Sequence, residues 1–143
     1  MTPYLKENRM NFSWPTRVYY EDTDSGGVVY YANYLKFMER ARTEYIRGLG
    51  VEQDDLAKNE NVIFAVRSVN VEYLKPARFN DALIVTAKVI ELKKTRMLFE
   101  QNIILQQDQT LLCTGETLIA SLRADTVRPV AVPQILREAF SVD

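Results

Sequence analysis

The chain has 143 residues, of which 47% are hydrophobic, and its 18 basic and 19 acidic side chains give a formal net charge of −1. This length and apolar content predict one domain with a real core, and the balanced charge excludes the strongly basic surface of a nucleic-acid-binding protein. No apolar run approaches the roughly 20 residues of a membrane helix, so we expect no integral membrane segment.

The first expected element is a short strand that follows a polar N-terminal segment. We assign residues 1–13 to a flexible N-terminal segment and residues 14–143 to the folded domain. Apolar and polar side chains alternate over residues 17–21, which predicts a strand that leads into a glycine-rich turn.

A long amphipathic helix is expected next, over residues 33–49. Its apolar side chains recur at helical spacing, with charged residues between them: Tyr34, Phe37, Met38, Ala41, Tyr45 and Leu49. Asn33 is a plausible N-cap, and Gly48 or Gly50 supplies the left-handed residue that commonly ends a helix. The apolar face of this helix needs a sheet to cover it.

A polar connection around residues 54–59 precedes a long strand-rich region. Alternating apolar side chains predict strands over residues 69–73, 83–89, 97–106 and 111–123. Turns are expected at Lys75-Pro76, at the basic stretch 93–96 and at residues 107–109, and residues 132–140 predict a short terminal helix. Short turns between successive strands indicate an antiparallel meander.

The predicted fold class is α+β, with the long helix covering one face of an antiparallel sheet. A curved sheet wrapped around one central helix is the hotdog arrangement. Periodicity by itself supports only the α+β assignment.

The most informative motif is residues 22–31, Asp-Thr-Asp-Ser-Gly-Gly-Val-Val-Tyr-Tyr. It places an acid at the end of a strand, before a glycine turn that leads into the helix. Backbone N–H groups at a helix start lack intrahelical partners and carry partial positive charge, so they can polarise a carbonyl oxygen while the acid acts on its carbon. The motif therefore predicts acyl-transfer chemistry, although a turn or helix cap is the structural alternative for Asp24.

The residues that are missing narrow this chemistry further. The chain has no histidine and a single cysteine, Cys113, which excludes Ser-His and Cys-His catalysis, the common zinc sites and an internal disulfide. We expect no metal site and no cofactor, and a reducing cytoplasm is the default location. Acid–base work then falls to carboxylates, tyrosines or lysines, and carboxylates are favoured because they ionise below neutral pH.

Several segments together resemble one known family. They are residues 17–24, 27–30, 33–34, 39–44, 71–73 and 76–78, in this order along most of the chain. The chain resembles the 4-hydroxybenzoyl-CoA thioesterase family of hotdog proteins, and within it the YbgC-like branch associated with the Tol-Pal system.

The resemblance implies roles for individual residues. It implies that Asp24 is the catalytic carboxylate and that the backbone N–H of Tyr31 donates to the thioester carbonyl. Gly27 and Val28 are then expected to bind substrate, since a glycine lets a ligand approach the backbone closely. Lys93, Lys94 and Arg96 are the candidates for binding the phosphates of coenzyme A, with a solvated basic turn as the alternative.

One residue departs from the family pattern, because many YbgC-like members carry histidine where this chain has Tyr31. A backbone donor tolerates this change, whereas an imidazole role does not. Tyr30 and Tyr34 are expected to be packing aromatics, Asp22 structural and Glu39 supporting.

The resulting hypothesis is an acyl-CoA thioesterase in which Asp24 either attacks the thioester or activates water. The competing hypothesis is a non-catalytic module that binds acyl-CoA or acyl carrier protein. CoA and a carrier protein both remain open as the acyl donor. A dimer is expected because a single hotdog subunit leaves sheet edges and one helix flank uncovered, and the family resemblance implies tetramers of such dimers.

Overall fold

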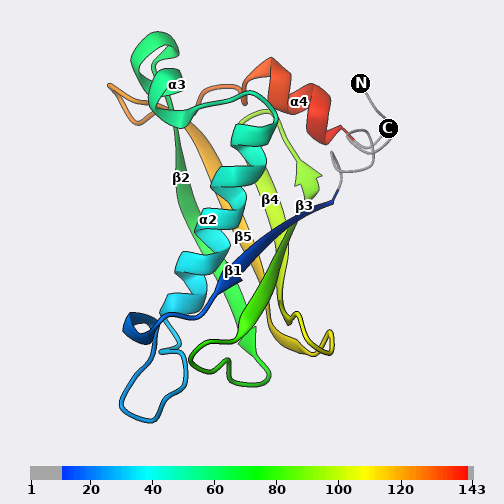
Figure 1. Ribbon diagram of the computed structural model, residues 1–143. Coiled ribbons are helices and arrows are strands. Elements are labelled where there is room, and N and C mark those ends of the chain that lie inside the picture. The colour runs from blue at the N-terminus through cyan, green and yellow to red at the C-terminus, as the bar shows by residue number, and fades with distance from the viewer. Residues whose placement is uncertain (1–10, 142–143) are drawn as a thin grey trace.

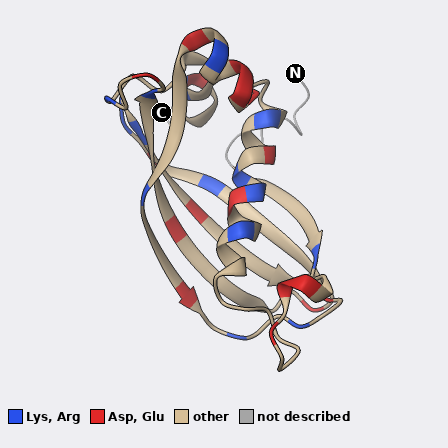
Figure 2. Cartoon of the chain, turned by 90° about the vertical axis from the view of Figure 1, so that its left-hand side faces the viewer, with Lys and Arg blue, Asp and Glu red and all other residues tan. Residues whose placement is uncertain are grey.

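The long helix α2 (Asn33–Gly48) crosses the concave face of a curved sheet in the computed structural model, which describes residues 11–141 (Figure 1). One side of the helix is buried, through Tyr34, Phe37, Met38, Ala41, Arg42, Tyr45 and Ile46. These positions follow the three- and four-residue spacing of one helix face. Charged residues are spread along the rest of α2 (Figure 2). The predicted helix is therefore confirmed in place and in orientation.

Five antiparallel strands form the sheet, in the order β1-β3-β4-β5-β2. Their bounds are β1 Phe12–Arg17, β2 Val62–Tyr73, β3 Ala82–Leu92, β4 Arg96–Leu105 and β5 Leu111–Arg123. Buried and less buried side chains alternate along β3 and β4, because one face of the sheet packs against α2. This arrangement confirms the α+β class and the sheet wrapped around one helix.

The predicted meander is right for three strands and wrong for β2. Strands β3, β4 and β5 follow one another through short turns, whereas β2 pairs only with β5, at the far edge of the sheet. The connection around Lys75-Pro76 is therefore not a hairpin turn. Residues 74–81 carry the chain across three strand spacings, roughly 14 Å, which a short turn does not span.

The first strand was placed wrongly by the sequence pattern. Strand β1 starts at Phe12 and ends at Arg17, and Tyr20–Asp22 is a short 3₁₀ helix rather than the end of a strand. The Asp22 carboxylate accepts a hydrogen bond from the Tyr19 N–H at 2.8 Å, and this local bond competes with an extended backbone. Residues 1–10 lie outside the described part of the chain, so flexibility in the 1–13 segment stays a prediction.

Two short helices close the end of the sheet that lies far from the start of α2. Helix α3 (Gln53–Glu60) replaces the predicted polar connection; it buries Leu56, and Asn61 ends it in a left-handed conformation. A single buried side chain leaves almost no helical periodicity to detect. Helix α4 (Gln134–Phe140) confirms the predicted terminal helix. Within residues 11–141, no helix is both long enough and apolar enough to cross a membrane.

The core between α2 and the sheet contains Cys113, on β5, which is completely buried. Its neighbours in this apolar cluster include Met38, Ile103 and Leu112. Burial raises the pKa of the Cys113 thiol to about 11, because a thiolate is poorly solvated there.

The buried thiol predicts both a labelling pattern and a pH dependence. A thiol reagent at mildly alkaline pH should leave the native protein unlabelled and should modify one thiol per chain after denaturation. The unfolded thiol loses its proton near its ordinary pKa of 9.0, below the pKa of the native thiol. This contribution to the free energy of unfolding should therefore fall as pH rises above about 9. Rapid labelling of the native protein would contradict the buried position.

Candidate active site

The glycine-rich turn of the motif forms a compact loop, residues 24–28, which we call the glycine loop. The Asp24 N–H donates to the Val28 carbonyl at 2.9 Å, and the Gly27 N–H donates to the Asp24 carbonyl at 3.1 Å. Gly27 has φ of 79°, in the left-handed region that glycine occupies without strain. The base of the loop is closed by antiparallel pairing of Thr23 with Val29. The loop thus holds its acid in one backbone geometry.

The Asp24 carboxylate is exposed at the surface and only half occupied. One oxygen, Oδ1, accepts the Gly26 N–H at 2.8 Å, which fixes the direction of the side chain. For the other oxygen, the described residues provide no hydrogen-bond donor. They also contain no group of three or more His, Cys, Asp or Glu side chains that could hold a metal ion. Asp24 therefore has one oxygen fixed and one oxygen available to a substrate or a water.

The start of α2 follows the glycine loop after one turn, Tyr30–Ala32. Asn33 is the first residue of the helix rather than its N-cap, so that part of the sequence prediction was wrong; Ala32 precedes it and makes no side-chain cap. In residues 11–141 the Tyr31 N–H has no acceptor, whereas the N–H groups of Tyr30 and Asn33 are both bonded. The expected oxyanion donor is thus an unpaired amide in the turn that leads into the helix.

The connection between β2 and β3 braces the glycine loop from one side. The Val29 N–H donates to the Ala77 carbonyl at 2.8 Å, and the Ala77 N–H donates to the Tyr34 hydroxyl at 2.9 Å. Val28 pairs with Arg78 in a further antiparallel bridge. Burial raises the pKa of Tyr34, so this hydroxyl stays neutral and accepts the amide. The sequence carried no signal for this contact, because the partners are 43 residues apart.

Exposed tyrosines surround the helix start. The Tyr31 ring lies 4.8 Å from Tyr30 and 6.1 Å from Tyr73, and Tyr73 lies 5.4 Å from Tyr34, measured between ring centroids. The side chain of Tyr31 is 61% exposed. Its backbone faces the site while its ring joins an aromatic surface that extends onto β2, which the sequence pattern alone did not reveal.

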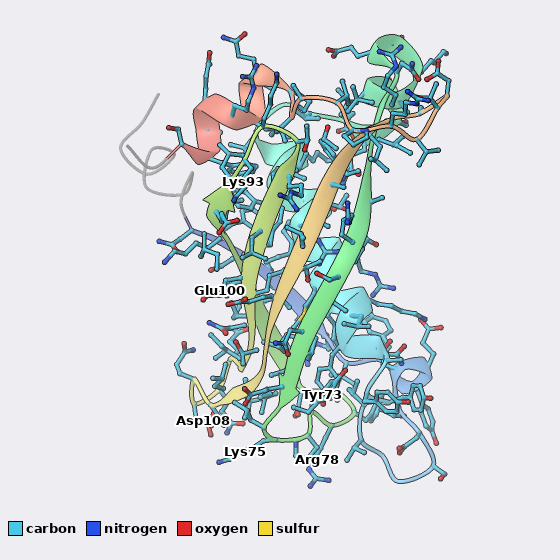
Figure 3. The ribbon with its side chains drawn as sticks, turned by 180° about the vertical axis from the view of Figure 1, so that it is seen from behind. Tyr73, Lys75, Arg78, Lys93, Glu100 and Asp108 are labelled. Carbon is cyan, nitrogen blue, oxygen red and sulfur yellow. The ribbon has the colours of Figure 1, made fainter. Side chains whose placement is uncertain are left out.

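The basic turn lies at the other end of the molecule. Lys93, Lys94 and Arg96 join β3 to β4 beside α4, where the Val132 N–H donates to the Lys94 carbonyl. Strand β3 separates this turn from the glycine loop by roughly 35 Å at the usual rise per residue. Figure 3 shows Lys93 at one end of the sheet, with Lys75 and Arg78 at the opposite end. Within one chain, the structure therefore does not bring the basic turn to Asp24.

A groove runs between α2 and the edge strand β2. It is lined by Leu35, Lys36, Glu39, Arg42, Val66, Val69 and Thr117. Arg42 is buried, with 8% of the residue exposed, yet it belongs to none of the ion pairs within the described residues. Its Nη1 donates to the Gln101 side chain at 2.9 Å, and Gln101 in turn donates to the Met38 carbonyl. Burial lowers the pKa of Arg42, and the nearby Glu39 carboxylate opposes that shift.

Comparison with known proteins gives the family of the chain. Residues 18–140 match the model of the Thioesterase-like superfamily. The chain belongs to this superfamily. It is 42% identical over 129 residues to the acyl-CoA thioesterase YbgC of Haemophilus influenzae, covering 90% of this chain and 93% of that protein.

Two further comparisons agree with this assignment. The chain is 41% identical to the acyl-CoA thioester hydrolase YbgC of Escherichia coli O6:H1, covering 93% of this chain and 98% of the relative. The crystal structure of a probable thioesterase from Bartonella henselae superimposes with a TM-score of 0.80 at 32% identity, covering 86% of this chain and 99% of that one. The resemblance to hotdog thioesterases is thus confirmed at the level of sequence and fold.

The brace between Tyr34 and Ala77 predicts a specific loss of stability. Tyr34→Phe removes the acceptor and leaves the fully buried Ala77 N–H unpaired, which should cost about 1–3 kcal/mol in the free energy of unfolding. Urea denaturation measures this cost. Tyr73→Phe is the matched control, because its ring is half exposed and its change should stay within about 0.5 kcal/mol. Equal effects of the two substitutions would contradict the brace.

Proposed function

We propose that the protein is an acyl-CoA thioesterase that hydrolyses acyl-CoA to a free acid and CoA. The observation that carries this proposal is a short segment with a half-occupied carboxylate, Asp24, on the glycine loop and an unpaired amide, Tyr31, in the turn before α2. The names and high coverage of the two YbgC relatives support the same reaction. The non-catalytic binding module remains the second candidate, favoured only by the missing histidine.

In the proposed reaction, Tyr31 N–H donates to the thioester carbonyl oxygen and stabilises the charge that develops there. Loss of one such donor costs roughly 3–4 kcal/mol in other hydrolases. The free oxygen of Asp24 either attacks the carbonyl carbon, giving an anhydride that water then cleaves, or removes a proton from an attacking water. In both routes one water is consumed: its oxygen becomes part of the free acid, and one of its protons ends on the CoA thiol.

The absence of histidine is compatible with this chemistry. A thiol has an ordinary pKa near 8.5, so CoA can leave as a thiolate without a strong general acid to protonate it. An amide or alcohol leaving group would need such an acid. Hydrolysis of a thioester therefore requires a carboxylate and an oxyanion donor. Asp24 and the Tyr31 N–H are the two groups of this kind in the site.

A second copy of the chain is the proposed cover for the groove beside α2. Among the described residues, strand β2 pairs with β5 alone, and Val66 and Val69 are 55% and 42% exposed along it. An edge strand of twelve residues with exposed valines invites pairing with another strand. Lys36 and Glu39 are exposed in the same groove with opposite charge, so a two-fold axis close to them would place acid against base.

This assembly would also bring a basic turn to the acid. The glycine loop and the turn at Lys93, Lys94 and Arg96 lie at opposite ends of one chain, so we propose that a neighbouring copy supplies the turn to the phosphates of CoA. Lys75 and Arg78 are the alternative within the same chain, since Val28 pairs with Arg78 at the glycine loop. The single buried cysteine favours the cytoplasm as the place of action.

Substitution of the acid tests the proposed reaction. Asp24→Asn keeps the shape of the side chain and removes its charge, so it should abolish nearly all thiol release from a panel of short, long and aromatic acyl-CoAs. Tyr31→Phe is the matched control, because it removes the hydroxyl and keeps the backbone N–H; its kcat should stay within a few-fold of wild type. Binding without hydrolysis by wild type would favour the binding module, and a large loss in Tyr31→Phe would assign chemistry to the phenol.

Mixing a variant with a weakened phosphate site and a variant without the acid tests the sharing of sites between copies. The triple change Lys93→Glu, Lys94→Glu and Arg96→Glu should raise KM by about tenfold or more, since charge-assisted contacts to phosphate are each worth about 1.5–3 kcal/mol. Co-expression of this variant with Asp24→Asn should restore activity, because mixed assemblies contain some sites with both an intact acid and an intact turn. An unchanged KM, or no recovery in mixed assemblies, would contradict the proposal and point to Lys75 and Arg78.

A further inference from the structure

One backbone oxygen joins the acid-bearing segment to the start of α2. The Asp22 carbonyl accepts two hydrogen bonds, from the Tyr30 N–H at 3.0 Å and from the Asn33 side-chain Nδ2 at 2.9 Å. The first of these bonds comes from the turn before the helix and the second from the first helical residue. Two donors on one oxygen tie two segments of the chain to a single point.

Each of the two groups proposed to act on the thioester lies two residues along the chain from the Asn33–Asp22 hydrogen bond. Asp24 comes two residues after Asp22, and Tyr31 comes two residues before Asn33. A displacement of Asp22 relative to Asn33 would therefore change the distance between the carboxylate and the unpaired amide. A misplacement of about 1 Å in such a pair can lower a reaction rate about 100-fold.

The surroundings of Asp22 hold its carbonyl in place. Its side chain is 91% buried, and its carboxylate accepts the Tyr19 N–H at 2.8 Å. The Asp22 N–H donates back to the Tyr19 carbonyl at 3.0 Å. Both faces of this residue are thus occupied, so its carbonyl is a fixed acceptor to which Asn33 can anchor the helix.

The chemistry of Asn33 fits this bond better than the role of helix cap. The Asn33 side chain donates away from the helix and makes no cap to its N–H groups. A carboxylate in its place would have no proton to donate and would repel the carbonyl oxygen. Asparagine is a weak helix former in this position, so its amide is needed for the bond to Asp22 rather than for helix stability.

We propose that Asn33 is a positioning residue that acts through Asp22 to set the separation of Asp24 from the Tyr31 N–H. The inference rests on the proposed function, since it assigns both groups to one reaction. Asn33 itself touches no reacting atom. Its removal should leave substrate affinity largely intact and lower the rate of the chemical step.

The experiment compares Asn33→Ala with Asn102→Ala in the full-length chain. Asn102, on strand β4, is a matched control. Its side chain also makes one hydrogen bond, which it accepts from the Thr114 hydroxyl at 2.7 Å. We expect Asn33→Ala to lower kcat by roughly 10- to 100-fold with KM within a few-fold of wild type. Asn102→Ala should leave kcat near wild type at a similar loss of thermal stability. Equal effects on kcat would overturn the proposal.

A double variant separates positioning from general weakening of the fold. In the Asp24→Asn background, Asn33→Ala should cause no further loss of the residual rate, because the group that it positions is already neutralised. A repeat of the full single-variant loss would overturn the proposal. Asn33→Asp is isosteric and lacks the donor, so it should behave like Asn33→Ala rather than like wild type.

Amide hydrogen exchange gives a readout that does not depend on activity. Asn33→Ala should accelerate exchange at the Tyr30 N–H and over residues 22–31 while leaving β4 and β5 at wild-type rates. Unchanged exchange at the Tyr30 N–H would overturn the proposed role of the Asn33–Asp22 hydrogen bond, even if the variant enzyme is active. If the wild type hydrolyses none of the acyl-CoAs yet exchange behaves as expected, the proposed function fails. The Asn33–Asp22 hydrogen bond then has a structural role alone.

Discussion

Met38 of α2 packs so closely on β5 that a Cβ added at Gly115 would meet its sulfur at 3.2 Å and its methyl carbon at 3.1 Å. The absence of a side chain at Gly115 therefore sets how near the helix comes to the sheet. From strand β4, the buried Gln101 side chain donates to the Met38 carbonyl of α2, which adds a hydrogen bond to the apolar contact. Because α2 is fixed against the sheet at its middle, its first turn is fixed as well, and the glycine loop has a rigid partner to dock against.

The elements that the sequence predicted well are those whose signal is local. Helix α2 shows a full apolar stripe, and β3 to β5 show alternation bounded by short turns, so both could be recognised without tertiary information. The position of β2 in the sheet could not be predicted, because alternation indicates which face of a strand is buried but not which strand lies beside it. The first strand was misplaced for a different reason, since the side chain of Asp22 bends the backbone into a 3₁₀ turn.

The same division applies to the candidate site. Asp24 and Tyr31 lie seven residues apart along the sequence, so their motif could be recognised directly in the chain. The contacts that brace them join segments far apart: Tyr34 meets Ala77, and Val28 meets Arg78. The groove with its buried Arg42 depends on the packing of α2 beside β2, which no short stretch of sequence encodes. The catalytic candidates could therefore be predicted from the sequence, whereas the long-range contacts that hold them could be identified only in the folded structure.

The topology also constrains how the chain can be made. Val62 of β2 pairs with Arg123 of β5, and Phe12 of β1 pairs with Ala87 of β3, so each edge strand leaves the ribosome long before its partner. At about 5–20 residues per second, β2 waits roughly 3–12 s for β5. The central meander β3-β4-β5 is synthesised after β1, α2 and β2, and it supplies the strands with which both edge strands pair. During translation, the N-terminal half therefore exposes surfaces that have no partner yet. A nascent chain that stalls before β5 leaves its valine-rich strand β2 unpaired and accessible to chaperones and proteases.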